Sequence, residues 1–554
     1  MASTLKSLVA FLASLIMLAA AVHLLQQLLV GDKEQGLRVS LESAPVLMSD
    51  ALVFTIAGDL ERVDDPAAMV ELDVDASRGE RSLAPGSLEP GLHVLSWSER
   101  YMGRAGRDAS FSVLSGPFAK PGEAVPCGIG LSLGIGVFDP LVRRLENEVR
   151  AALGSVPMLP GAARVSVSPY FVEGGLDVLL EVGFREGSSL NARVPLEFTL
   201  DSRGDLVLNR RAEVDATVRG ALGAMAAFHG GGLSRALETL SSREGGGLSG
   251  AMEAAREAGG RTVGKEIAAQ VDSWLPVLNE ELSRALPREL DLRFGESRLV
   301  VGLSVCAQPA SKARSLFLSF DARLRLLHAS QGSKRLRLEG ADGEAIGPVL
   351  TRGEPISAPM LRRRDEVSLS ISEDLFNFFF HEAWLVGLID DLIGGESILK
   401  RLGSEMRGAL SLAPTSIELD LPPVLRFEED ALRVRAGELR IGTTSGESSV
   451  HTDIVAYLDG YLDLGLQAES LSLSARPSAF GASCSHFVDG VDVRRPCLFE
   501  LLQEVELRFL GKDLGMKLEI PLGDILEDLP VRLEDLSLRD GSLDLVFFST
   551  GLNI

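Results

Sequence analysis

Apolar residues recur at helical spacing in two segments of the chain. In Val137–Leu153 they lie three or four positions apart, which predicts an amphipathic helix. Ala251–Leu286 predicts a longer one, with a kink expected at Pro276 because proline cannot donate the helical hydrogen bond. The apolar stripes are Phe138, Leu141, Val142, Leu145, Val149 and Leu153 in the first helix, and Val263, Ile267, Val271, Leu275, Leu278 and Leu282 in the second.

A third predicted helix, Ser372–Ile393, is apolar nearly all round. Ser372 is a suitable N-cap, and Glu373 and Asp374 suit the positive end of the helix dipole. A surface helix needs only one apolar stripe, so we expect burial of this helix by a sheet and also by a partner or an apolar ligand. Ordinary core packing is the alternative. Its apolar residues are Leu375, Phe376, Phe378, Phe379, Phe380, Trp384, Leu385, Val386, Leu388 and Ile389.

Alternating patterns predict strands through most of the remaining chain. Residues 36–118 contain short alternating runs separated by Pro- and Gly-containing turns, which is typical of a small immunoglobulin-like β-sandwich. Further strands are predicted at Arg164–Tyr170, Leu176–Phe184, Ala192–Leu200, Asp205–Glu213, Ser416–Leu421, Ala431–Ile441, Ile454–Leu464, Gln467–Leu473, Glu504–Phe509 and Leu514–Ile520, followed by a hairpin at Asp540-Gly541.

Two landmarks indicate an internal duplication. The strand-like run around Leu133 matches the run around Leu369, an offset of 369 − 133 = 236 residues. The segment that begins at Leu286 matches the segment that begins at Leu529, an offset of 529 − 286 = 243 residues. Similar offsets favour two copies of one plan, and chance similarity of apolar strands is the alternative.

The N-terminal segment is apolar and uncharged from Ser7 to Val30. It is typical of a signal peptide, with Ala19–Ala21 as a cleavage site, or of a membrane anchor, so residues 1–31 carry both interpretations. A buried helix of the fold is the third. Either of the first two places the rest of the chain outside the cytoplasm: secreted, periplasmic or tethered to a membrane.

Composition narrows the classes of function. The 554 residues carry a net charge of −23, which argues against a nucleic-acid binder that relies on clustered Lys and Arg. Four cysteines without a CxxC pair argue against zinc ribbons and thioredoxin-like chemistry. Cys484 and Cys497 flank a polar loop and predict a disulfide; Cys127 and Cys306 are available for a second that the sequence does not assign.

Motifs for catalysis are incomplete. Gly130–Gly134 matches G-x-S-x-G around Ser132, but the strand-to-helix context of a nucleophile elbow is not predicted. His381-Glu382 begins like a zinc-binding H-E-x-x-H motif, but Leu385 stands where the second histidine is needed. We therefore expect no enzyme, no metal site and no cofactor.

The segment Val367–Asn377, with Gly387 ten residues beyond it, resembles the start of the second barrel in the bactericidal/permeability-increasing protein family. That family includes lipopolysaccharide-binding and plasma lipid-transfer proteins of the tubular lipid-binding superfamily. Weaker similarity lies in Leu290–Val305, Leu316–Leu327, Pro355–Pro359 and Leu529–Phe548, so that the resemblance spans about residues 128–554.

The resemblance implies an α+β fold of two tandem, helix-wrapped antiparallel β-barrels joined by a central sheet in a boomerang. It places the first barrel at 128–305, the central sheet and linker at 306–360 and the second barrel at 361–554. The small β-sandwich and the N-terminal apolar helix precede this arrangement. Endotoxin-neutralising members are basic, whereas this chain is acidic, so a lipid carrier is the better match.

We expect a lipid-binding or lipid-transfer protein that holds acyl chains between helix and sheet in each barrel. The partners would be phospholipid or another acyl lipid and a membrane surface, with no nucleic acid. Alternatives are a ligand-free structural or interaction protein, and a lipid-recognition factor without transfer. The predicted groove residues are Phe138, Leu141, Leu145, Val149, Ile267, Val271, Leu275, Leu375, Phe376, Phe379, Phe380, Trp384 and Leu388.

Overall fold

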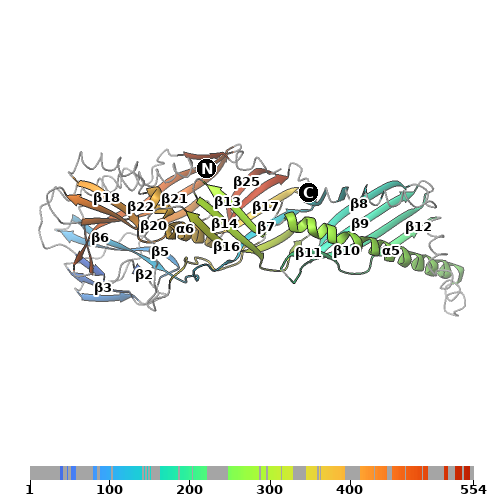
Figure 1. Cartoon of the computed structure of the whole chain (residues 1–554), viewed down its shortest axis with the longest axis horizontal. Coiled ribbons are helices and arrows are strands. Elements are labelled where there is room, and N and C mark those ends of the chain that lie inside the picture. Colours follow the sequence, from blue (N-terminus) through green and yellow to red (C-terminus); the bar gives the residue numbers. More distant parts are fainter. Residues whose placement is uncertain are drawn as a thin grey trace.

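The computed structural model shows an elongated molecule built mostly of β-sheet with few helices (Figure 1). It describes parts of 38–150, then 162–220, 247–328, 345–393, 412–496, 517–521 and 531–549, with short gaps inside several of these ranges. Among those residues no helix combines the length and the apolar character needed to cross a membrane. The predicted N-terminal helix lies outside the described residues.

A central sheet joins strands from both halves of the chain. Its order is β13-β14-β16-β7-β17-β26-β25, with β15 paired to β16. At its middle, β7 and β17 pair antiparallel, with Leu131 opposite Leu369 and Ile129 opposite Ile371. The bounds are β7 Val125–Gly134, β13 Glu289–Phe294, β14 Ser297–Val305, β15 Ala310–Lys312, β16 Ser315–His328, β17 Glu366–Ser372, β25 Val531–Arg539 and β26 Ser542–Ser549.

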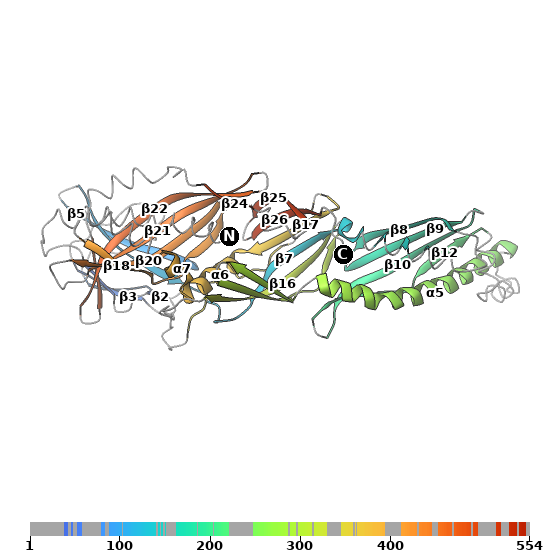
Figure 2. The ribbon, with the colours of Figure 1, turned by 45° about the horizontal axis from the view of Figure 1, so that its top comes forward.

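The first half forms its own antiparallel sheet beside a long helix. Strand order is β11-β10-β9-β8, with β12 also paired to β10. Helix α5, Gly247–Ala285, runs alongside this sheet and continues through Pro276 (Figure 2). The strands are β8 Ala162–Val172, β9 Gly175–Phe184, β10 Ser189–Leu200 and β11 Leu206–Arg210, close to the predicted segments, and β12 Asp215–Arg219, which was not predicted.

The second half forms a larger sheet of order β18-β20-β21-β22-β23-β1-β3-β4, with β19 on β20 and β24 on β22. Helix α6, Glu373–Leu385, contacts the central strands β7, β16 and β17 as well as β19. The remaining bounds are α7 Leu388–Ile393, β18 Leu412–Leu419, β19 Val424–Glu428, β20 Ala431–Ser445, β21 Thr452–Gln467, β22 Ser470–Val488, β23 Val491–Pro496 and β24 Lys517–Pro521.

The region 36–118 departs from the predicted separate sandwich. Strand β1 pairs with β23, so that Val39 lies opposite Arg494, and β3 and β4 extend the same sheet. The separate sandwich is therefore corrected: the alternating runs indicated β1, β3, β5 and β6, but not β2, β4 or the strands with which they pair. The strands are β1 Arg38–Leu41, β2 Val46–Leu47, β3 Leu52–Ala57, β4 Gly79–Leu83, β5 Gly91–Tyr101 and β6 Arg104–Ser115, with β2, β5 and β6 in a small sheet.

A buried ionic network fastens this N-terminal region to the second half. The fully buried Arg494 lies 2.6 Å from the Glu438 carboxylate and 2.8 Å from that of Asp492. Glu438 also accepts a hydrogen bond from the backbone N–H of Ser112 in β6, at 2.7 Å. Removal of one partner would leave a buried charge unpaired, so the network ties β6 to the larger sheet.

The third predicted helix is two helices. Ser372 caps α6 by accepting from the backbone N–H of Leu375 at 3.1 Å, as predicted. The helix ends at Leu385, and Gly387 then adopts a φ of +76°, a conformation that costs glycine little. Helix α7 begins one residue later, so the prediction of one continuous helix to Ile393 is wrong.

The disulfide of the described chain joins Cys127 to Cys306, with their Cα atoms 5.6 Å apart. Cys127 lies in β7 and Cys306 directly after β14, so the bond links two strands of the central sheet. The sequence had made these two cysteines available for a second disulfide without assigning it. Cys497 and the side chain of Cys484 are outside the described residues, so their predicted bond is not described.

Candidate apolar binding groove

A cavity of about 280 Å³ lies between helix α5 and the inner face of the first-half sheet. Twelve of its fourteen lining residues are apolar; the polar ones are Glu266 and Gln270. The helix supplies Glu266, Ile267, Gln270, Val271, Trp274, Leu275 and Leu278, and the sheet supplies Val167, Val178, Leu180, Val182, Leu190, Val194 and Leu196. We call this set the groove.

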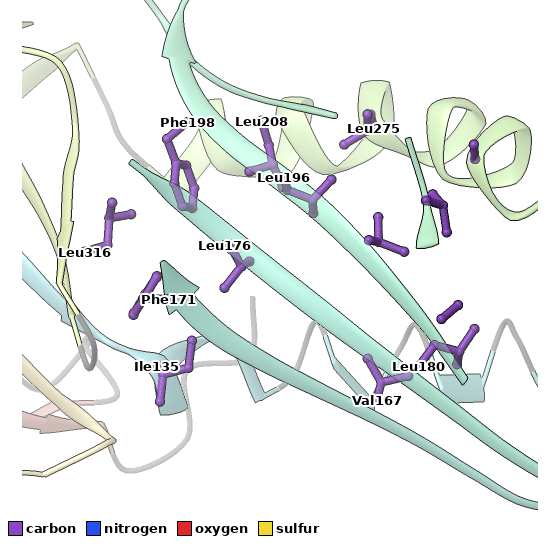
Figure 3. Close-up of a cluster of buried hydrophobic side chains, with 14 of the residues drawn as sticks. Ile135, Val167, Phe171, Leu176, Leu180, Leu196, Phe198, Leu208, Leu275 and Leu316 are labelled. Carbon is purple, nitrogen blue, oxygen red and sulfur yellow. The ribbon is translucent and has the colours of Figure 1, made fainter. Parts of the chain in front are cut away.

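The sheet wall follows from strict alternation. Successive side chains of a strand point to opposite faces, so alternate residues of β9 and β10 share the inner face. Antiparallel register then places Val178 opposite Val194 and Val182 opposite Leu190. Figure 3 shows Leu180 and Leu196 of this face in the same buried cluster as Leu275 of α5. The result is a continuous apolar wall.

Specific polar contacts fix α5 against the sheet. The Asn279 side chain accepts from the backbone N–H of Leu208 at 2.7 Å and donates to the Leu208 carbonyl at 3.1 Å. It thereby satisfies the backbone of β11 as a neighbouring strand would. Two parallel hydrogen bonds join Arg210 to Asp272, at 2.9 and 2.8 Å. These contacts hold the helix wall at one distance from the sheet.

Two glycines allow the close approach of α5 to β12. A Cβ atom at Gly260 would lie 2.4 Å from the carbonyl oxygen of Ala216, and one at Gly264 would lie 2.6 Å from that of Val214. Any larger residue would push the helix away. These two positions were not predicted from the sequence, although glycines four residues apart in a long helix are a visible signal.

The structure brings together three predicted groove residues of α5: Ile267, Val271 and Leu275. Phe138 lies in the adjoining core, with its ring centroid 5.8 Å from that of Phe171. The other predictions on that segment, Leu141, Leu145 and Val149, are outside the described residues. The other eleven lining residues were not predicted. They are the seven strand residues, whose alternation marked a buried face but not a groove, and Glu266, Gln270, Trp274 and Leu278 of α5.

The predicted residues of the third helix have partners within the chain. Leu375 and Leu388 are buried against the central sheet, and Phe379 packs on the same cluster. Phe376 and Phe380 pack on the opposite side, against β19, β20 and β26. Trp384 is buried and donates its indole N–H to the carbonyl of Leu419. Protein thus covers both sides of α6, and a ligand is not needed to explain its apolar surface.

The polar residues at the start of α6 hold the surrounding loops. Asp374 accepts from the backbone N–H groups of Thr351 and Gly353, both at 2.8 Å. Glu373 accepts from the backbone N–H of Phe427 at 2.5 Å, and burial raises its pKa. Asn377 accepts from the Leu425 N–H at 2.8 Å and donates to the Thr351 hydroxyl at 3.0 Å. The segment that carries the family resemblance is therefore a structural clamp.

The two catalytic motifs do not build a reactive site in the described chain. Ser132 is fully buried within β7, two residues before the strand ends at Gly134; it is paired with Ser368, and its hydroxyl has no hydrogen-bond partner among the described residues. It is not at a strand-to-helix turn. His381 is buried, and burial lowers the pKa of its ring to about 4, although a backbone hydrogen bond with Ile346 acts in the opposite direction.

No family model matches the chain, and no curated protein matches it. Among solved structures, the chain is similar to the crystal structure of lipopolysaccharide binding protein. The two share 12% identity with a TM-score of 0.31, and the match covers 77% of this chain and 100% of that chain. So distant a likeness does not assign the chain to a family.

Proposed function

We propose that the chain binds a lipid by holding an alkyl chain in the groove beside α5. The observation that carries this proposal is the twelve apolar residues around a cavity of about 280 Å³. Small-molecule sites commonly measure about 300–1,000 Å³, so this volume suits one chain rather than a whole two-chain lipid. Each CH₂ moved from water into such a site contributes about 0.8 kcal/mol.

The finer parts of the proposal concern transfer and location. Binding of this kind needs no catalytic residue. Transfer between membranes would use the same groove and requires that the lipid leave it again. We propose an exported protein, in line with the apolar N-terminal sequence; the bond between Cys127 and Cys306 supports an oxidising compartment.

The two halves have different roles in this proposal. The first half carries the groove. In the second half, the packing of α6 against protein on both sides favours a structural role for the residues first predicted to bind lipid there. One lipid per chain is then expected.

The test places a carboxylate in the groove. Val271→Asp should weaken binding of a fluorescent fatty acid at least tenfold, because a charge in an apolar site is costly. Val277→Asp is the matched control: this valine lies on the same helix but is 45% exposed and outside the groove. Far-UV circular dichroism confirms folding, and Val271→Phe fills the groove without charge. Unchanged binding by both Val271 variants would overturn the proposal.

A further inference from the structure

The edge of the groove carries a line of three chemically distinct side chains. Glu266, Gln270 and Trp274 follow one another at intervals of four residues on α5. Residues four apart lie on the same side of a helix, about one turn from each other. Glu266 and Gln270 are exposed, Trp274 is half-buried, and all three line the groove. The line therefore runs from solvent to the apolar interior.

We propose, building on the proposed function, that this line is a head-group site for alkyl amphiphiles with a positively charged head. The head would lie beside Glu266, and the tail among the valines and leucines, with the Trp274 ring about two helical turns further along as part of the apolar wall. A carboxylate attracts an ammonium group by charge. The same carboxylate repels a phosphate or carboxylate head group.

Among the charged side chains near the groove, Glu266 is the one that sets the head-group preference. It is the charged member of the groove. Lys265 is adjacent in sequence but lies about 100° further round the helix and is not among the lining residues. Arg210 is paired with Asp272, and Arg261 with Glu257. The net charge of −23 acts in the same direction, although salt screens it beyond about 8 Å.

The experiment compares three probes with the same twelve-carbon tail: dodecyltrimethylammonium, dodecyl maltoside and dodecanoate. Each is titrated into the full-length protein below its micelle concentration, with calorimetry and the tryptophan fluorescence of the protein, to which Trp274 contributes, as readouts. The cationic probe should bind roughly three- to tenfold more tightly than the anionic one, because a partly exposed carboxylate attracts the first head group and repels the second. The preference should shrink in 0.5 M salt.

Variants separate the head-group site from the groove. Glu266→Gln should abolish the preference while the maltoside probe binds as before, and Glu266→Lys should reverse it. Glu257→Gln is the matched control, since Glu257 is an exposed carboxylate of the same helix that does not line the groove. Equal binding of all probes to the wild-type protein, or a preference that survives Glu266→Gln, overturns the head-group site alone. No binding of any probe overturns the proposed function as well.

Discussion

Ser132 and Ser368, 236 residues apart in sequence, lie directly opposite each other in β7 and β17. The same offset relates Leu133 to Leu369, the landmark that predicts an internal duplication. The two serines face each other, and their neighbours are exchanged, with Leu133 opposite Val367 and Leu131 opposite Leu369, which is the pattern of a local twofold axis. Both serines are fully buried, and neither hydroxyl has a hydrogen-bond partner in the described structure.

The unpartnered hydroxyls predict that Ser132→Ala is neutral or stabilising. An unsatisfied buried hydroxyl costs about 1–3 kcal/mol, which the methyl group of alanine does not. Urea unfolding of wild type and variant measures the difference. Ser370→Ala is the control in the neighbouring β17 position, because its hydroxyl donates to Asp544 at 2.5 Å. The control should lose stability; a loss of the same size in Ser132→Ala would show a partner for that hydroxyl.

The clamp at the start of α6 predicts a large effect of Asn377→Ala. The change leaves the buried N–H of Leu425 without an acceptor and removes the bond to Thr351, at a cost of about 2–4 kcal/mol. Thermal unfolding measures it. Asn209→Ala removes one exposed side-chain bond, to Thr199, and should cost much less. Equal effects of the two substitutions would contradict the structural role given to Asn377.

Asp390 predicts a pH-dependent gain on substitution. Burial, followed by the nearby Glu418, Asp420 and Asp391, raises its pKa from 3.8 to about 6. As the pH rises, Asp390 therefore ionises in the unfolded state before it does so in the folded state. Its ionisation lowers the free energy of unfolding between pH 3.8 and about 6, and the loss is complete above that range. Asparagine can still accept from the N–H of Leu419. Asp390→Asn should therefore be more stable by about 1–2 kcal/mol at pH 8, after allowance for solvent screening.

Unfolding curves of Asp390→Asn and wild type at several pH values check this prediction. The free energies of unfolding of the two proteins should become similar below pH 3.8, where Asp390 is protonated in both the folded and the unfolded state. A gain that is the same at every pH would contradict it.

His381 should make the protein less stable as the pH falls, the opposite of the effect of Asp390. Burial lowers its pKa from 6.5 to about 4, so the unfolded state takes up a proton first as the pH falls. Wild type should lose about 3 kcal/mol from this residue between pH 6.5 and 4. His381→Phe retains a ring beside Trp384, whose centroid is 5.8 Å away, and should lack that part of the acid sensitivity. Parallel acid profiles of the two proteins would be the contrary result.

Periodicity predicted what depends on neighbours in sequence. The apolar stripe from Val263 to Leu282 predicted α5, and alternation predicted β8, β9 and β10. Three of the helix residues chosen for the groove line it because a stripe must face the sheet. Trp274 was missed because it lies at the edge of that stripe.

Pairing between distant segments was not predictable in the same way. The apolar surface of α6 indicated burial on two sides, but not that β19, β20 and β26 provide the second side. The sequence match that begins at Leu529 made β26 equivalent to β14. In the sheet, β26 is instead equivalent to β16, because β26 lies beside β17 and β16 lies beside β7. Short apolar strands resemble one another in sequence, and only their register in the sheet distinguishes them.

The most direct test of the central claim is native mass spectrometry, with lipid extraction, of protein purified from an exporting host without detergent. The account predicts one alkyl-chain lipid per wild-type chain, and none in Val271→Asp although Val277→Asp retains it. A folded wild-type protein that is lipid-free and takes up no fluorescent fatty acid would contradict it, as would lipid retained by Val271→Asp.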